Sequence, residues 1–267
     1  MASRTKQKEE ARARRLAEEQ ARAERARRDR RIRTIGGIVL GAIIVVAVLI
    51  VVSSGGNKGG IKTGTEATAT ANAVEQMFAG IPQSGATLGN AKAPVTMTYF
   101  GDYECPVCQA FTLQGGFPQL VANEVRQGKV KVVYKSYCTA TCNAFGPNAS
   151  IFNTQQVAGL AAGKQNRFWQ YTELFYRQQG QEGSGYVNEA FLTSLARQTT
   201  GLNVSTWQSD RSDPTLNNQV NSDQNDAKTA GVSGTPTLIF QGPKGQAAAS
   251  AAVPSYAQLQ QAIKQVS

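Results

Sequence analysis

An uninterrupted apolar run, IGGIVLGAIIVVAVLIVV over residues 35–52, divides this chain of 267 residues into two unlike parts. As a helix it would reach about 27 Å, which suffices to cross a hydrocarbon core of about 30 Å with slight local thinning. Residues 1–34 carry 13 Lys and Arg against 6 Asp and Glu, whereas the rest of the chain carries 15 against 12. Because flanking positive charge stays on the cytoplasmic side, the pattern predicts a basic cytoplasmic tail (1–34), one single-pass transmembrane anchor (35–52) in the cell membrane, and an extracytoplasmic remainder.

The competing interpretation of the apolar run is a cleaved signal peptide. Signal peptides have a short basic region and a small-residue cleavage site, whereas this basic region is long and no A-x-A motif follows within reach. The tail is rich in Ala, Arg and Glu, so we expect a solvated helix that contacts the headgroups of the lipid bilayer. Nucleic acid is the disfavoured partner, because the tail has no aromatic ring for base stacking.

The chain after the anchor consists of a predicted linker followed by a predicted folded domain. Residues 53–86 are dominated by Gly, Ser, Thr, Ala and Asn, a composition that predicts a flexible linker. Hydrophobic periodicity begins after it, so a folded domain is predicted over residues 87–267. A domain of that size supports one hydrophobic core.

Short β-branched and aromatic segments alternate with amphipathic ones in this domain. Strands are predicted at 95–100, just before a Cys-Pro-Val-Cys motif, and at 129–137. A Thr-Pro pair within 231–240 then leads into another apolar strand, and a further short strand is expected at AAASAA. Helices are predicted at 149–163, 167–179, 188–199, 214–229 and 255–266. This order of strands and helices indicates an α/β domain.

The cysteines carry most of the chemical information. The chain has no histidine, which excludes Ser-His and Cys-His catalysis and a histidine-ligated metal. Its four cysteines, Cys105, Cys108, Cys138 and Cys142, lie in one segment. A CxxC pair can exchange disulfides, form half of a metal site or staple a fold. Zinc bound by all four needs a reducing environment, whereas the predicted topology places them outside the cytoplasm, so we expect no metal and no cofactor.

The CxxC motif at the start of a helix favours redox chemistry. Cys105 would lie beside the unpaired backbone N–H groups and the positive dipole end of that helix, both of which favour a thiolate. Pro106 suits the first helical turn, because its missing N–H would have no intrahelical partner. We therefore predict that Cys105 is the attacking and leaving sulfur in thiol–disulfide exchange, and that Cys108 resolves the mixed disulfide.

Two motifs, FGDYECPVCQAF at 100–111 and GVSGTPTLIF at 231–240, together resemble the DsbA-like branch of the thioredoxin superfamily, in particular its membrane-tethered DsbA/BdbD type. The resemblance covers about residues 87–267. It implies a thioredoxin-like fold with a helical domain inserted at about 143–229. It also implies that Pro236 is cis and faces the CxxC motif, and that Thr235 and Pro236 bind an extended substrate.

The same resemblance suggests roles for the remaining polar residues. Accessory disulfides in some DsbA-like proteins imply that Cys138 and Cys142 form a structural disulfide. Many relatives carry a buried, proton-relaying carboxylate six positions before the first cysteine, where this chain has Tyr99. Asp102 or Glu104 is the candidate to replace that proton relay.

The function implied is disulfide formation in unfolded or reduced secreted proteins by a membrane-anchored, extracytoplasmic thiol:disulfide oxidoreductase. Its reoxidation would need a membrane redox partner of the DsbB-like or vitamin-K-epoxide-reductase-like kind, because this chain carries no quinone site. Two alternatives stay open. One is a disulfide reductase or isomerase, and the other is a non-catalytic tethered binding module in which both cysteine pairs form structural disulfides.

Overall fold

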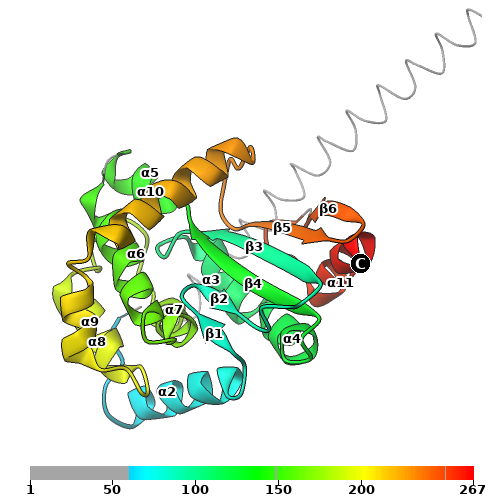
Figure 1. The fold of residues 1–267 in the computed structure, drawn as a ribbon. Coiled ribbons are helices and arrows are strands. Elements are labelled where there is room, and N and C mark those ends of the chain that lie inside the picture. The colour runs from blue at the N-terminus through cyan, green and yellow to red at the C-terminus, as the bar shows by residue number, and fades with distance from the viewer. Residues whose placement is uncertain (1–59, 148, 250) are drawn as a thin grey trace, which may run out of the picture. The chain divides into compact units, whose positions relative to one another are not determined.

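The computed structural model describes residues 60–147, 149–249 and 251–267 (Figure 1). The predicted tail (1–34) and anchor (35–52) lie outside these ranges, and none of the helices within them has the length and apolar character to cross a membrane. The described part contains a six-stranded sheet with the order β1-β2-β4-β3-β5-β6. Its strands are β1 (Gln83–Ser84), β2 (Thr87–Leu88), β3 (Val95–Gly101), β4 (Val130–Ser136), β5 (Thr237–Gly242) and β6 (Gly245–Ala248).

The two central strands, β3 and β4, run parallel. Their register pairs Val95 with Val130 and Gly101 with Ser136, so both strands end at the same edge of the sheet. β5 pairs with the other side of β3 in the antiparallel direction. β3 is mostly buried, as expected for a strand with β-branched and aromatic residues that is covered on both faces. The strands predicted at 95–100 and 129–137 are confirmed to within a residue.

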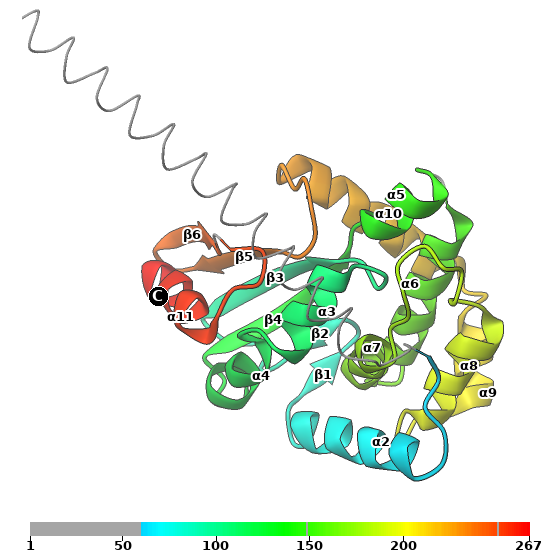
Figure 2. The ribbon, with the colours of Figure 1, turned by 180° about the vertical axis from the view of Figure 1, so that it is seen from behind.

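A helical crossover connects β3 to β4. It consists of α3 (Pro106–Leu113), α4 (Phe117–Leu120) and a π-helical turn, η1 (Val121–Val125). α3 lies on the sheet face that Figure 2 turns toward the viewer, where the ring of Phe111 meets that of Tyr99 edge-on at a centroid distance of 5.3 Å. The C-terminal helix α11 (Tyr256–Val266) contacts α4, β5 and β6 and begins with a capping box at Ser255.

The helical insertion predicted between β4 and β5 is present in the structure. Its helices are α5 (Ala140–Phe145), α6 (Ser150–Gly163), α7 (Phe168–Arg177), α8 (Glu189–Gln198), α9 (Val204–Asp210) and α10 (Pro214–Thr229). The side chains of Asn188, Asn203 and Asp213 cap α8, α9 and α10 by accepting backbone N–H bonds. The sequence pattern predicts α6, α7, α8 and α10 but neither α5 nor α9.

The prediction of a flexible linker over 53–86 is wrong for the part that the structure describes. Helix α2 (Gly64–Phe78) occupies that segment and packs against α7 and α8. Val74 and Phe78 are buried, and the ring of Phe78 lies 6.4 Å from that of Trp169. The helix forms because apolar residues four apart make one buried stripe within an otherwise Thr- and Ala-rich sequence. Residues 53–59 lie outside the described ranges.

An aromatic cluster joins the insertion to the strands. Tyr103, which follows β3, stacks on Phe175 of α7 at 4.6 Å and on Tyr134 of β4 at 5.7 Å. All three side chains are buried. Packing of this kind anchors the segment between β3 and α3, which contains the first cysteine.

Candidate active site

The candidate site lies where β3 ends and α3 begins. Cys105 is the N-cap residue of α3, and Pro106 occupies the first helical turn, as predicted from the sequence. Cys108 lies one turn further along the helix. Both cysteines carry free thiols and are buried, Cys108 completely and Cys105 with 5% of its surface exposed. The structure therefore describes the reduced dithiol, with Cys105 the more accessible sulfur.

The Thr-Pro motif is brought to Cys105 from 130 residues further along the chain. The Thr235–Pro236 peptide bond is cis, which confirms that prediction. The Cys105 thiol donates to the backbone carbonyl of Thr235, with a sulfur–oxygen distance of 3.3 Å. Thr235 and Pro236 are half-buried. Their predicted role in binding substrate stays a prediction.

The two thiols have opposite pKa shifts. A hydrogen bond from the Cys108 side chain lowers the pKa of Cys105, with further help from Thr235 and the Cys108 backbone, and these effects outweigh burial. Burial raises the pKa of Cys108, and charge on Cys105 raises it further. The site thus favours one thiolate at Cys105 and a protonated thiol at Cys108.

These shifts predict the pH dependence of alkylation in the reduced protein. Because its pKa is lowered, Cys105 should react with iodoacetamide at pH values where an ordinary thiol is still protonated, whereas Cys108 should stay unmodified. In Cys108→Ala the main hydrogen bond that lowers the pKa of Cys105 is lost, so the midpoint should move to higher pH. Mass-spectrometric alkylation rates across a pH series measure both. An unchanged midpoint in Cys108→Ala would contradict the assigned cause.

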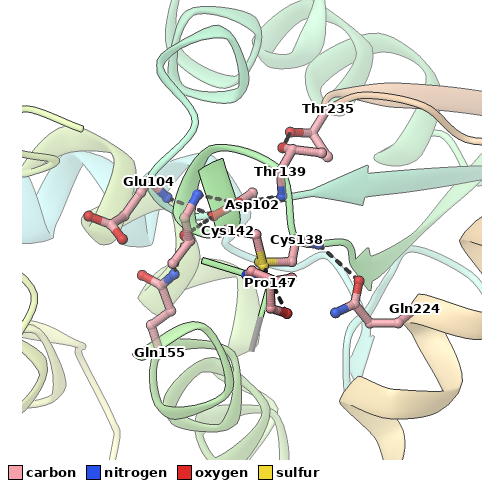
Figure 3. Close-up of a disulfide and its surroundings, with 10 residues drawn as sticks. Asp102, Glu104, Cys138, Thr139, Cys142, Pro147, Gln155, Gln224 and Thr235 are labelled. Atoms are coloured by element: carbon pink, nitrogen blue, oxygen red, sulfur yellow. Dashed lines mark hydrogen bonds between the residues drawn. A yellow bond between two sulfur atoms is a disulfide. The ribbon is translucent and has the colours of Figure 1, made fainter. Parts of the chain in front are cut away.

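Asp102 lies beside the loop that contains Cys138 and Cys142 (Figure 3). One carboxylate oxygen accepts hydrogen bonds from the backbone N–H groups of Thr139 and Thr141, both at 2.9 Å. The other accepts the Thr141 hydroxyl at 2.6 Å and the Glu104 N–H at 3.1 Å. The carboxyl is buried, and burial raises its pKa. We call these four residues the Asp102 network. It fastens the turn before Cys105 to the N-terminus of α5.

The second cysteine pair closes the loop that enters α5. Cys138 and Cys142 form a disulfide, as the resemblance implies, and their sulfurs are therefore not available as thiolate ligands for zinc. The Cys138 N–H donates to the Gln224 side chain on α10 at 3.0 Å. Within the loop, the hydroxyl of Thr139 hydrogen-bonds that of Thr235. The disulfide loop thus contacts the residue that faces Cys105.

Glu104 has a different environment from Asp102. Its side chain is 1% exposed, and neither carboxylate oxygen has a hydrogen-bond partner among the described residues. Burial, followed by the charge of Asp102, raises its pKa to about 7. Figure 3 shows the carboxyl directed away from Asp102. Both candidate relay residues thus lie in the turn before α3, while the Asp102 carboxylate is occupied by the network that holds this turn.

The pKa of Glu104 has a consequence for stability. The folded protein holds this proton more tightly than the unfolded chain, so the stabilisation present at pH values below about 4.5 is lost as the pH rises toward about 7. Glu104→Gln, which cannot ionise, should therefore raise the melting temperature at pH 8 and change it little at pH 4.5. Melting curves at the two pH values measure this, and an equal change at both would contradict it.

The structure adds contacts that sequence reasoning missed. The amide of Gln179, just beyond α7, donates to the backbone carbonyls of Tyr103 at 2.6 Å and Cys105 at 3.2 Å. Under α3, the Tyr99 hydroxyl lies within hydrogen-bonding distance of Thr112 and Tyr176. No local signal identifies these partners, because each comes from an element distant in sequence.

A cis-proline opposite a CxxC motif at a helix N-terminus, on a sheet with a helical insertion, defines a thioredoxin-like protein of the DsbA type. Comparison with known proteins agrees. The model of a family described as Thioredoxin matches residues 83–265. The chain therefore belongs to this thioredoxin family.

Curated relatives that this chain resembles include disulfide bond formation proteins. Disulfide bond formation protein D of Bacillus subtilis is 26% identical over 151 residues, which span 57% of this chain and 65% of that relative, just under two thirds of its length. The probable disulfide bond formation protein D of Bacillus cereus is 25% identical and covers 62% of this chain and 74% of the relative.

Two crystal structures share the fold. Oxidised BdbD from Bacillus subtilis aligns with a TM-score of 0.57 and 22% identity, covering 68% of this chain and 91% of that one. DsbA2 from Pseudomonas aeruginosa aligns with a TM-score of 0.52 and 19% identity, covering 70% and 97%. The DsbA-like fold expected from the sequence is thereby confirmed.

Proposed function

We propose that this protein is a thiol:disulfide oxidoreductase that forms disulfides in secreted proteins through Cys105 and Cys108. The observation that carries the proposal is the placement of Cys105. It lies at the N-terminus of α3 with a lowered pKa, and its sulfur is 3.3 Å from the carbonyl of Thr235. The similarity to disulfide bond formation proteins supports oxidation of the substrate, with electrons passing from substrate thiols to the Cys105–Cys108 disulfide.

The reaction begins from the oxidised pair. A substrate thiolate attacks the sulfur of Cys105, the Cys105–Cys108 bond breaks, and the electron pair leaves on Cys108. A second substrate thiolate then attacks the substrate sulfur of the mixed disulfide and releases Cys105 as a thiolate. One substrate dithiol is oxidised and the Cys105–Cys108 pair is reduced. The lowered pKa of Cys105 makes this release favourable, because a stable leaving thiolate makes its disulfide more oxidising.

The remaining features complete the proposal. Thr235 and Pro236 would hold an extended stretch of substrate beside Cys105. The apolar run 35–52 and the basic segment before it support a single-pass membrane anchor with the catalytic domain extracytoplasmic. A membrane redox partner, DsbB-like or vitamin-K-epoxide-reductase-like, would return the reduced pair to the disulfide.

The deciding experiment measures the direction of exchange with the full-length chain in detergent. The oxidised protein should restore activity to a reduced, unfolded secretory enzyme. Its Cys105–Cys108 redox potential should lie nearer about −120 mV, as for strong oxidants, than about −270 mV, as for reductases. A value near the lower figure would indicate the reductase alternative, and failure of both cysteines to exchange would indicate the binding module.

The membrane topology needs its own test. Cysteine-reactive reagents that cannot cross the membrane should label a single cysteine added to the domain in intact cells, and should fail to label one added to the tail before lysis. The opposite pattern, or recovery of the protein without residues 1–52, would contradict the anchored topology.

A further inference from the structure

The hydroxyl of Thr139 connects the disulfide loop, residues 138–142, to the segment that faces Cys105. We propose that Thr139 is a positioning residue for substrate: its hydroxyl holds Thr235 in the orientation in which the Thr235–Pro236 segment meets an extended peptide. The inference rests on the proposed thiol–disulfide exchange. It adds to that reaction a residue that lies in neither the CxxC motif nor the Thr-Pro motif.

The Thr139 hydroxyl does not have the role that its position in the chain would suggest. Thr139 is the N-cap residue of α5, and a threonine at such a position ordinarily accepts a backbone N–H bond from the first turn of its own helix. No such bond is present at Thr139. The acceptor at this helix end is the Asp102 carboxylate, which binds the backbone N–H groups of Thr139 and Thr141, both at 2.9 Å. The Thr139 hydroxyl is therefore free to bond outside its own helix.

The partner of this hydroxyl is the hydroxyl of Thr235, and the contact closes a ring of four residues. Figure 3 shows the two hydroxyls directed toward each other. Asp102 accepts the Thr139 N–H on one side of the ring. On the other side, the Thr235 carbonyl accepts the Cys105 thiol at 3.3 Å, and the Cys105 N–H donates to the Asp102 carbonyl at 3.1 Å. Thr139 thus links the turn before α3 to the Thr235–Pro236 segment.

The Thr235–Pro236 segment has few other contacts of this kind. Residues 233–236 are exposed or half-buried. Apart from a bond within their own turn, the side-chain hydrogen bonds that join them to other described residues all involve Thr235. The bond from Cys105 needs the thiol hydrogen, so it is lost whenever Cys105 is in a disulfide. In the oxidised protein, which is the form that attacks by substrate convert, the Thr139 hydroxyl is the contact that remains.

The disulfide loop gives Thr139 a fixed support. The bond between Cys138 and Cys142 joins the chain on either side of it, and the Cys138 N–H donates to Gln224 of α10 at 3.0 Å. A covalent link of this kind limits the conformations open to the loop. Thr139 therefore holds Thr235 from a support that does not depend on whether the CxxC pair is oxidised.

Two substrates of the oxidised full-length protein separate positioning from chemistry. One is a reduced peptide with two cysteines, which would lie along Thr235 and Pro236, and the other is dithiothreitol, which is too small to do so. In each reaction the substrate dithiol is oxidised and the Cys105–Cys108 disulfide is reduced, so no other oxidant is needed. Acid quenching followed by alkylation of the free thiols gives a second-order rate constant for each substrate.

Thr139→Val removes the hydroxyl but keeps the shape of the side chain and the N–H that Asp102 binds. It should lower the ratio of the peptide rate constant to the dithiothreitol rate constant about fivefold, which is the loss expected for one neutral hydrogen bond. Thr139→Ser keeps the hydroxyl and should retain most of the ratio. A purely structural role would instead slow both substrates to the same extent and leave the ratio unchanged.

Thr235→Val tests whether Thr139 acts through Thr235. Because both variants delete the same bond, the ratio in the double variant should be no lower than in Thr235→Val alone. Losses that multiply in the double variant, equal slowing of both substrates, or a ratio in Thr139→Ser as low as in Thr139→Val would each overturn the inference. An unmodified protein that oxidises neither substrate would instead defeat the proposed function, so the two failures are distinguishable.

Discussion

Replacing Cys105 by alanine should abolish thiol–disulfide exchange. We expect the rate of substrate oxidation to fall by about a thousandfold or more, the order of loss that follows deletion of a nucleophile. The reason is geometric as well as chemical, because Cys105 has the lowered pKa, the partial exposure and the contact with Thr235. Refolding of a reduced secretory enzyme, followed by recovered activity, measures the loss.

Cys108→Ala is the counterpart of that variant. Cys105 can still form a mixed disulfide, but no intramolecular thiol can resolve it, so adducts with substrate proteins should accumulate. Non-reducing gels and peptide mapping detect them. Adducts in Cys105→Ala that map to Cys138 or Cys142 would contradict the division of roles and make the second pair redox-active.

Asp102→Ala should destabilise the protein by about 3 kcal/mol or more, because several buried donors lose their acceptor at once. These donors are the backbone N–H groups of Glu104, Thr139 and Thr141 and the Thr141 hydroxyl. The Asp102 side chain is fully buried, so bulk water does not reach these donors in the native structure. Urea denaturation, with the unfolding free energy extrapolated to water, measures the effect.

Asp226→Ala is the control for this measurement. Asp226 is about half exposed and its carboxylate pairs with Lys135 on the surface of the protein. Exposed ion pairs contribute about 0–1 kcal/mol, so its loss should be small. If Asp102→Ala were no less stable than Asp226→Ala, the Asp102 network would not hold the turn before Cys105 in the way the hydrogen bonds indicate.

Local sequence patterns were sufficient to predict β3, β4 and the start of α3. β3 and β4 follow from β-branched and aromatic residues, and the start of α3 follows from Pro106 after a strand and a short turn. α2 escaped prediction because its Thr- and Ala-rich composition conceals a narrow stripe of buried residues. α5 escaped it because the acceptor at its N-terminus is Asp102, which lies 39 residues before Thr141.

In the candidate site, too, the sequence predicts some residues and not others. Cys105 and Cys108 follow from a short motif, and the cis-proline follows from the family resemblance. The partners that tune them do not, because Tyr176 and Gln179 come from the end of α7 and reach the site only through tertiary packing. Composition also could not separate Asp102 from Glu104, since both lie in the turn before α3 and differ only in the hydrogen-bond partners that the fold provides.

The helical insertion between β4 and β5 is not independent of the candidate site, because its residues hold the segment before α3 in place. Thr141 on α5 binds the Asp102 carboxylate, and Gln179 after α7 donates to the Cys105 carbonyl. A minimal core made by joining β4 directly to β5 would keep every strand and both cysteines of the CxxC motif. It would lose the groups that fix the turn in front of them, so transplanting this dithiol to another scaffold requires the insertion as well.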